Sequence, residues 1–479
     1  MHATAHGRGV LSRPLDTQES VRRREGQRTH CDVPAPPLYA STSYRSVRCA
    51  RAVMMVTLDR WRSHRPVLLI TCFNADAPTS GYATRVLQMV DSYTARGFDV
   101  NVLRFVPIAH CAQSWGAPLK ERGARRVIEC VAPPISRYEF GRRLAVYWCR
   151  PLVFAARLLL RPAIVQAEGH EAAAVTLWRG KGALQVADLH GALPEETEYR
   201  RQRQHGSLAR APRWFHCHEA RVLRACDAYL VVSNGMVSHL HKKLGKAAFH
   251  KKAFLLDVKS SARFMHATAR VTRENYGIAD EEIVIVYSGG TQAYQRLPAI
   301  ASFVATLGAY VERLRFVVFT ADPDGARCQL ERLTDGIQTI VASVAPSELH
   351  AHLRVGDFGI IFRDDHVINR VASPTKIWEY LLSDLHVICN HAAGNAAEAA
   401  GALNAALVVD PDPTSDQWPA IAKAVATIVQ KRRAAPGLVA TTAEEYLQRE
   451  GDWESRFDAW LSHLRTLAAP RRGLWETLP

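Results

Sequence analysis

Residues 369–382 read Asn-Arg-Val-Ala-Ser-Pro-Thr-Lys-Ile-Trp-Glu-Tyr-Leu-Leu, and the apolar run Leu-His-Val-Ile-Cys follows at 385–389. The pattern predicts a helix with Ser373 as N-cap and Pro374 in the first helical position, where no amide donor is needed. The following run is typical of a short strand that is covered on both sides. One face of the helix is apolar and is expected to be buried, formed by Ile377, Tyr380 and Leu381.

Lys376 falls in the first turn of this helix, where the partial positive charge of the helix start disfavours a cation. A bound anion would reverse this preference, because free amides, the helix dipole and an ammonium together form a phosphate site. Glu379, one turn further on, would then accept hydrogen bonds from a sugar hydroxyl. On these residues alone, a capped surface helix with an incidental lysine remains the alternative.

Length and charge set the broad class. The 479 residues are enough for two or three domains with their own cores. No apolar run reaches the roughly eighteen residues that a transmembrane helix needs. The formal net charge of +15 favours anionic partners such as phosphorylated substrates, acidic polysaccharide, nucleic acid or anionic lipid. Ten scattered cysteines without a Cys-x-x-Cys pair are typical of reduced thiols in a cytosolic protein.

The N-terminal segment differs from the rest. Residues 1–60 are rich in Arg, Ser, Thr and Pro and lack periodicity, which predicts disorder. No apolar signal-peptide core follows Met1. Met54 and Met55 stand just before the first ordered pattern, so we expect the true start there and a translated upstream segment before it. A functional basic tail is the alternative.

Short apolar runs then alternate with amphipathic segments. A strand at 66–71, a helix at 83–96 and a strand at 100–105 predict a βαβ unit in a parallel sheet. In such sheets ligands collect beyond the carboxyl ends of the strands. His170 and His190 follow further strands, predicted at 163–167 and 183–187, so both are expected near a binding site. Two more strands of this half are predicted at 228–232 and 254–257.

Two other segments of this half suggest a function. The run 216–218, His-Cys-His, suggests a metal site, but its spacing cannot present all three side chains on one face. We interpret that run as structural and predict no metal ion. Residues 142–160 combine arginines with Leu, Tyr, Trp and Phe, which predicts a basic amphipathic helix. Such a helix lies either on a membrane surface or on the surface of its own domain.

The second half repeats the strand and helix alternation. Residues 258–281 are polar and irregular and are expected to link two domains. After a strand at 282–287 comes the pair Gly289-Gly290, whose missing side chains let the backbone approach a ligand closely. Arg296 follows this pair at the start of the next helix. Further strands are predicted at 315–320, 339–344, 357–362 and 406–410.

The opening stretch, Pro374 to Leu382 followed by a strand, resembles the donor-site helix of glycosyltransferases of the family 4 type, especially bacterial capsule and exopolysaccharide enzymes. Arg363 and Asn369 match the loop before that helix. The resemblance covers the C-terminal half well and the N-terminal half more loosely. Gly289, Gly290 and Arg296 resemble the diphosphate loop of the same enzymes.

The N-terminal half carries two weaker matches. Residues 188–196, Asp-Leu-His-Gly-Ala-Leu-Pro-Glu-Glu, resemble the family's acceptor-side segment, with His190 in the place of the histidine beside the transferred sugar. Residues 79–81, Thr-Ser-Gly, and Arg85 resemble its opening glycine loop, although an ordinary strand-to-helix turn explains them equally well.

The resemblance implies an α/β fold of the GT-B type, with two Rossmann-like domains whose parallel sheets face across a cleft. The implied activity is transfer of a hexose from a nucleotide-sugar donor to a glycan or lipid-linked acceptor in cell-surface polysaccharide synthesis, with retention at the anomeric carbon. The nucleotide sugar is a substrate, and no separate cofactor is implied. The expected divisions are a leader at 1–60, an acceptor domain at 61–260, a donor-nucleotide domain at 261–440 and a closing helix and tail at 441–479.

Site roles follow from the same resemblance. Arg296 and Lys376 are expected to stabilise the leaving diphosphate, Glu379 to hold donor hydroxyls, and His190 to hold the sugar or orient the acceptor. Many family 4 enzymes carry a second glutamate where this chain has Val371, so Arg363 and Asn369 would compensate. The expected donor-binding set is Gly289, Gly290, Arg363, Asn369, Pro374 and Thr375.

Three alternatives stay open at this point. A sugar-nucleotide epimerase has the same fold, and so would a catalytically inactive scaffold of a polysaccharide assembly complex. The basic charge also suggests a nucleic-acid-binding protein, but the chain has no recognisable module for it, and we predict no nucleic acid partner. We expect a cytoplasmic location, with attachment to an anionic membrane surface on the inner face of the cell membrane as a further option.

Overall fold

A computed structural model describes residues 65–74, 80–108, 114–133, 139–177, 182–205, 213–245, 252–257 and 271–469. The predicted leader over residues 1–60 lies outside these ranges, as does most of the predicted linker at 258–281. Within the described ranges, no helix combines the length and the apolar character needed to cross a bilayer.

The first half of the described chain forms a parallel sheet of seven strands in the order β3-β2-β1-β4-β5-β6-β7. β1 pairs with β2 on one side and with β4 on the other, so the strand order reverses at β1 and β4. Ligands of open parallel sheets bind at such a switch point. The strands are β1 (Val67–Phe73), β2 (Asp99–Pro107), β3 (Arg126–Ala132), β4 (Ile164–Glu168), β5 (Leu184–Leu189), β6 (Ala228–Val231) and β7 (Ala253–Leu255).

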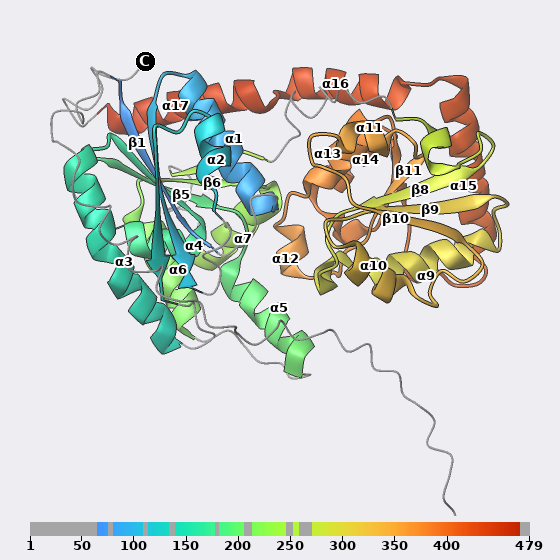
Figure 1. Ribbon diagram of the computed structural model, residues 1–479, viewed down its shortest axis with the longest axis horizontal. Helices are drawn as coiled ribbons and strands as arrows, with labels where there is room; N and C mark the ends of the chain where they lie inside the picture. Colours follow the sequence, from blue (N-terminus) through green and yellow to red (C-terminus); the bar gives the residue numbers. More distant parts are fainter. Residues whose placement is uncertain are drawn as a thin grey trace, which may run out of the picture. The chain divides into compact units, whose positions relative to one another are not determined.

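Helices cover both faces of this sheet (Figure 1). One core cluster lies between the sheet and α3, α4, α6 and α7, and a second lies between the sheet and α1, α2 and α17. The apolar strands are therefore buried on both sides, as their sequence predicted. The helices of this half are α1 (Gly81–Ala95), α2 (Gly116–Glu121), α3 (Glu139–Leu160), α4 (Gly169–Thr176), α5 (Leu193–His205), α6 (Arg213–Ala225) and α7 (Asn234–Leu244).

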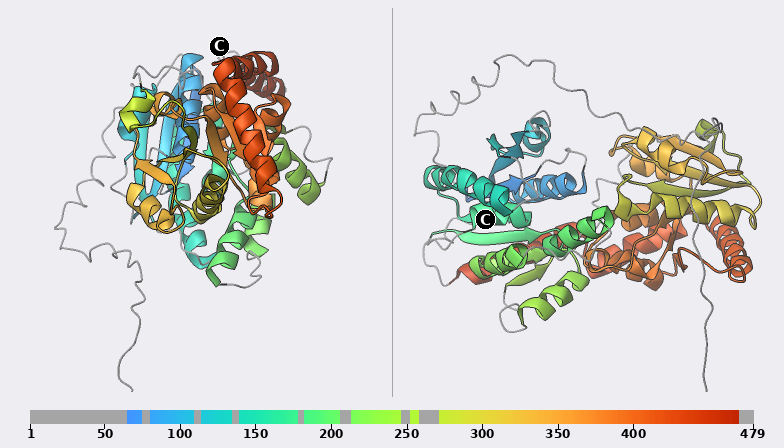
Figure 2. Two further views of the ribbon diagram at one scale, coloured as in Figure 1. Left: turned by 90° about the vertical axis from the view of Figure 1, so that its right-hand side faces the viewer. Right: turned by 90° about the horizontal axis from the view of Figure 1, so that it is seen from below.

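The second half forms a parallel sheet of six strands in the order β10-β9-β8-β11-β12-β13. Again two core clusters cover its two faces, one with α11, α13, α14 and α16 and the other with α9, α10 and α15 (Figure 2). The strands are β8 (Ile283–Ser288), β9 (Leu314–Phe319), β10 (Gln338–Ala342), β11 (Phe358–Ile361), β12 (His386–Cys389) and β13 (Ala406–Val408).

The remaining helices belong to the second half and to the closing region. Short 3-10 turns η4 (Arg273–Tyr276), η5 (Ala293–Gln295) and η6 (His391–Ala393) complete the second half. The helices are α9 (Leu297–Gly308), α10 (Pro323–Leu330), α11 (Leu349–Leu353), α12 (Val367–Arg370), α13 (Thr375–Leu382), α14 (Asn395–Ala402), α15 (Trp418–Ala434), α16 (Leu438–Glu450) and α17 (Trp453–Ala468).

The last helix, α17, returns to the core of the first sheet. Trp453, Phe457 and Trp460 are each at most 2% exposed and pack in the cluster that also contains α1. The two parallel sheets confirm the predicted α/β architecture of two Rossmann-like domains.

One prediction at the opening stretch is wrong. The structure starts α13 at Thr375 with Pro374 as the N-cap residue, so Ser373 is not the cap. Pro374 has an extended backbone (φ −71°, ψ 118°), which places it outside the helix. The predicted buried face is confirmed, because Ile377, Tyr380 and Leu381 are fully buried.

Candidate active site

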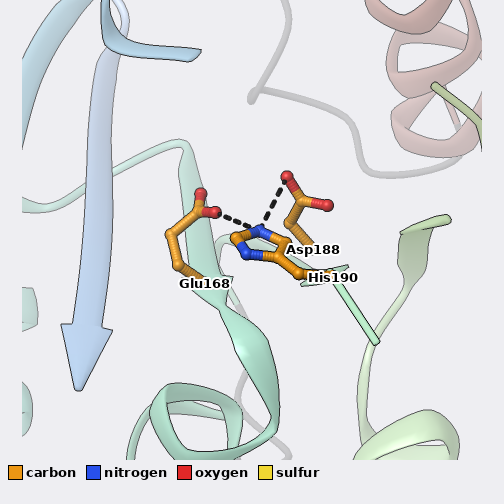
Figure 3. Close-up of side chains that lie close together, drawn as sticks. All are labelled: Glu168, Asp188 and His190. Atoms are coloured by element: carbon orange, nitrogen blue, oxygen red, sulfur yellow. Dashed lines mark hydrogen bonds and ion pairs between the residues drawn. The ribbon is translucent and has the colours of Figure 1, made fainter. Parts of the chain in front are cut away.

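Three titratable side chains meet where β4 and β5 end, beside the switch point (Figure 3). Glu168 is the last residue of β4, Asp188 lies near the end of β5, and His190 follows β5 directly. His190 Nε2 lies 3.0 Å from Glu168 Oε2 and 3.5 Å from Asp188 Oδ2. The Tyr82 ring lies 4.8 Å from the imidazole, centroid to centroid, and the Tyr82 hydroxyl donates to the Glu168 carbonyl oxygen at 2.8 Å.

Arg85 balances part of the negative charge of the Glu168 and Asp188 carboxylates. Its Nε and Nη2 donate to the two carboxylate oxygens of Asp188 at 2.9 and 3.1 Å, and its Nη1 donates to the Leu256 carbonyl at 3.0 Å. The side chains of Arg85 and Asp188 are 3% and 0% exposed, so this is a buried bidentate ion pair. Breaking such a pair leaves an uncompensated buried charge, and for that reason Arg85 fixes the position of Asp188.

The electrostatics favour a protonated His190. Burial alone would lower its pKa, but the charges of Asp188 and Glu168 and their hydrogen bonds outweigh burial and raise the pKa to about 9. Burial would likewise raise the pKa of Asp188, yet Arg85 and His190 hold it well below its usual range. Burial and the neighbouring Asp188 raise the pKa of Glu168. Near neutral pH a protonated His190 can donate hydrogen bonds from its ring nitrogens but cannot accept a proton.

A chain of buried hydrogen bonds reaches Glu168 from behind. Trp460 Nε1 donates to the Tyr93 hydroxyl at 2.8 Å, and that hydroxyl donates to Gln166 Oε1 at 2.8 Å. Gln166 Nε2 then donates to Glu168 Oε1 at 2.6 Å. Every donor in this chain points towards Glu168, so its carboxylate accepts from Gln166 on one oxygen and from His190 on the other.

The same cluster has the geometry of a cation site. Glu168, Asp188 and His190 each offer a ligand atom within 4.8 Å of the others. However, Arg85 and a protonated His190 already balance the two carboxylates, and Arg85 engages both oxygens of Asp188. A divalent cation would have to displace a proton and compete with a guanidinium, so the charges present do not call for one.

The predicted donor residues gather around the turn after β8. Lys376 Nζ donates to Gln295 Oε1 at 2.8 Å and lies 4.5 Å from the centroid of the Tyr287 ring. A β-carbon at Gly289, which has φ +143°, would overlap the Lys376 ammonium. Only a residue without a side chain lets the ammonium lie against this turn. Burial and the nearby Arg363 lower the pKa of Lys376 well below its usual value, with Glu379 opposing them.

Two arginines border the same turn. Arg363 is 7% exposed, donates to the carbonyls of Phe362 and Tyr294 at 3.2 and 3.5 Å, and has a pKa that burial lowers. Within the described residues, no salt bridge joins Lys376 or Arg363 to a carboxylate. Arg296 pairs with Asp364 at 3.3 Å and has a left-handed backbone (φ 55°), which a non-glycine residue adopts only at a cost.

The other predicted donor residues have defined places. Pro374 and Thr375 begin α13, and burial raises the pKa of Glu379 one turn later. Asn369 is buried, and its Nδ2 donates to the Asp364 carbonyl at 2.9 Å, which shapes the loop that carries Arg363. The Tyr287 hydroxyl donates a hydrogen bond to the Gly290 carbonyl at 2.6 Å.

Val371 stands where many relatives of the family have a glutamate. It is 1% exposed and packs in an apolar core cluster, where a carboxylate would be desolvated. Ser233 Oγ donates to the Val371 carbonyl at 2.6 Å and accepts from Met236 N at 2.9 Å. Ser233 therefore caps the N-terminus of α7 and also holds the backbone at Val371. Position 371 has a structural role in this chain.

The sequence motifs assign no individual role to two members of the His190 cluster, Glu168 and Asp188. Arg85 was predicted only by its resemblance to the arginine that accompanies the family's opening glycine loop, and Thr79 of that loop lies outside the described residues. The signal for Glu168 and Asp188 was a charged residue at the carboxyl end of an otherwise apolar strand, where ligands collect. His170, which was also expected near a binding site, pairs with the buried Glu219 at 3.2 Å and is not a member of the His190 cluster.

A family model matches part of the first domain. Residues 79–250 match the model of Glycosyltransferase Family 4, which includes the whole His190 cluster. The match falls on the first domain, although the motifs resembled the family best in the second. None of the curated protein sequences matches the chain.

Solved structures share the fold over most of the chain. Sucrose-phosphate synthase from Thermosynechococcus elongatus is 14% identical with a TM-score of 0.62, and the match covers 85% of this chain and all of that one. The alpha,alpha-trehalose-phosphate synthase (UDP-forming) from Burkholderia vietnamiensis is 14% identical over 84% of this chain and all of that one, with a TM-score of 0.54. WaaG, a glycosyltransferase involved in lipopolysaccharide biosynthesis, is 14% identical over 85% of this chain and all of its own, with a TM-score of 0.51. The likeness establishes the GT-B fold.

Proposed function

We propose that this chain, a glycosyltransferase with a family 4 domain and the GT-B fold, transfers a hexose from a nucleotide-sugar donor to a glycan or lipid-linked acceptor. The observation that carries the donor side is a pair of basic side chains, the half-buried Lys376 and the buried Arg363, beside the turn at Gly289. Burial lowers the pKa of both groups, so a bound anion would stabilise their charged forms. A nucleoside diphosphate supplies that anion.

The proposed chemistry is substitution at the anomeric carbon. The bond from the acceptor oxygen to that carbon forms as the bond from the carbon to the diphosphate oxygen breaks, through an oxocarbenium-like transition state. Lys376, Arg296 and the backbone amides at Gly289 and Gly290 would stabilise the negative charge that develops on the leaving diphosphate. Glu379 would hold donor hydroxyls.

The acceptor proton needs a recipient, and His190 is a poor one. A histidine with a pKa of about 9 already carries its proton near neutral pH. The leaving diphosphate oxygen therefore takes the acceptor proton in this proposal, which agrees with retention of configuration. His190 would donate from Nδ1, the ring nitrogen not bound to Glu168, to a sugar or acceptor oxygen.

The biological setting follows as part of the proposal. Work on cell-surface polysaccharide, at the inner face of the cell membrane, would account for a basic protein of this type. The resemblance to capsule and exopolysaccharide enzymes supports transfer to a growing glycan or to a lipid-linked acceptor.

The test combines nucleotide binding with product analysis. Calorimetry with uridine, guanosine, adenosine and cytidine diphosphates is expected to show binding of one of them. Lys376→Ala and Glu379→Ala should each abolish transfer while the fold remains intact. Lys423→Ala, an exposed lysine of the same domain, is the matched control. A folded protein that binds none of the nucleotides would instead be an inactive scaffold, and a sugar isomer formed without acceptor would identify an epimerase.

A further inference from the structure

Helix α3 exposes an apolar face of unusual size. Seven large apolar side chains on this one helix are between 38% and 67% exposed. Most of them have another member of the set three or four residues away, so the set lines one side of the helix. We call this set the α3 apolar face; it consists of Leu144, Tyr147, Trp148, Leu152, Phe154, Leu158 and Leu159.

The opposite side of α3 is the side that the protein needs for its own core. Ala145, Cys149 and Val153 are almost fully buried and pack in the core cluster of the first sheet. The helix lies beside α4 over the sheet (Figure 1). Folding of the domain therefore does not account for the apolar side chains on the outer side, and contiguous exposed patches of this kind mark interaction sites.

The charge of the helix indicates the partner. The α3 sequence has four arginines (142, 143, 150 and 157) and one acid, Glu139, which gives the helix a net charge of +3. The whole chain carries a net charge of +15. An anionic surface is attracted to such a helix, whereas a second copy of this chain would bring like charges together.

We propose that the α3 apolar face inserts into the interfacial layer of a membrane that contains anionic lipids. Tyr147 and Trp148 combine an apolar ring with a polar group, a pairing suited to the boundary between headgroups and acyl chains. The leucines enter the acyl region, and the net positive charge of the helix attracts lipid phosphates.

This docking would place the acceptor side of the enzyme near lipid. As the crossover between β3 and β4, α3 starts at the carboxyl edge of the sheet, the edge that carries Glu168 and His190. Leu144, Tyr147 and Trp148 lie in the half of the helix nearer that edge. This point rests on the proposed function, because a lipid-linked acceptor would then approach His190 from the docked surface. The docking itself does not depend on the transfer reaction.

The test is flotation of the full chain with vesicles of phosphatidylcholine, with and without phosphatidylglycerol. We expect binding to the anionic vesicles only, weaker but still present at high salt, because salt screens the arginines and not the apolar contacts. The variant Tyr147→Ser with Trp148→Ser should bind about tenfold or more weakly, since two large side chains lose their burial in lipid.

Controls keep the outcome clear. Leu438→Ser on α16 changes an equally exposed side chain (60%) outside the α3 apolar face and should bind like the unchanged chain. A second variant, Leu158→Ser with Leu159→Ser, repeats the test if the first one fails to fold by circular dichroism. The proposal is overturned if the unchanged chain does not float or if both folded variants float as well as it does. A dimer that the variants dissociate, without vesicle binding, would assign the face to self-association instead.

Discussion

Trp460 in the last described helix donates from its indole nitrogen to the hydroxyl of Tyr93 at 2.8 Å, although the two residues are 367 positions apart in the chain. Both side chains are fully buried. Because the Tyr93 hydroxyl passes its own hydrogen bond to Gln166, which binds Glu168, this contact links α17 to the partner of His190. Each hydrogen bond in this series has a defined donor and acceptor, so each can be removed and tested separately.

Tyr93→Phe removes the middle of this chain of hydrogen bonds while keeping the ring. The change leaves Trp460 Nε1 and Gln166 Oε1 without their present partner in a buried place, which costs about 1–3 kcal/mol for each unsatisfied group. We expect a lower free energy of unfolding in urea and a lower rate of transfer. Tyr310→Phe, on a side chain that is 45% exposed, should change neither. Equal stability of the two variants would contradict the role of the buried hydroxyl.

The interactions of His190 with Asp188 and Glu168 make stability depend on pH. The folded-state pKa of His190, about 9, exceeds its ordinary value of 6.5. The stabilisation is therefore complete below about pH 6.5 and is lost as the pH rises through about 9. A difference of this size corresponds to about 3 kcal/mol. Urea unfolding across that pH range measures it.

Glu168→Gln tests the cause of this dependence. The neutral amide no longer stabilises the imidazolium, so the titration of His190, followed by NMR of ring-labelled protein, should move to lower pH. Glu454→Gln changes a carboxylate that is 56% exposed and should leave the titration in place. An unaltered His190 titration in Glu168→Gln would show that Asp188 alone holds the proton.

Lys376 links donor binding to proton uptake. Its pKa is lowered by burial and by Arg363 in the structure without ligand, and a bound diphosphate would raise that pKa again. Binding should therefore take up a proton, and affinity should weaken by about tenfold per pH unit between the two pKa values. Calorimetry of nucleoside diphosphate binding in two buffers of different ionisation enthalpy measures the uptake. Lys376→Met should bind without it; uptake of the same size in that variant would assign the proton elsewhere.

Gly289→Ala tests the close approach of backbone and ammonium. The added methyl would overlap Lys376 Nζ, and φ +143° is open only to glycine at low cost. We expect a loss of stability of about 1–3 kcal/mol and of most nucleotide affinity. Gly401→Ala is the matched control, because a methyl there meets no atom within 4 Å and α14 should gain about 0.5–1 kcal/mol. Unchanged nucleotide binding in Gly289→Ala would remove this turn from the donor site.

The sequence predicted the fold well because its strands are short, apolar and separated by amphipathic helices. β1 was expected at 66–71 and occupies Val67–Phe73, and β2 was expected at 100–105 and occupies Asp99–Pro107. Buried parallel strands have a simple pattern that tertiary contacts rarely override. The N-cap of α13 was wrong by one residue because the extended backbone of Pro374 depends on the loop before it.

Site residues could be predicted only where a motif existed. Lys376, Glu379 and His190 lie in recognisable local patterns, and their roles stay predictions. Arg85 and Asp188 are 103 positions apart, and only the three-dimensional packing of α1 against β5 makes them a pair. The series of hydrogen bonds from Trp460 to Glu168 likewise joins separate segments, and none of these segments has a sequence motif that predicts the contact. Long-range polar contacts of this kind need coordinates.

The return of α17 to the first sheet also has a consequence for biosynthesis. Trp453, Phe457 and Trp460 are made after every described strand, yet they complete the core on one face of the first sheet. On the ribosome, α1 and α2 therefore cover that face only in part until the closing helix emerges. A premature stop codon at position 453 would leave the second sheet complete and impair the first, so a lesion at the distal end of the gene would act on the domain that contains His190.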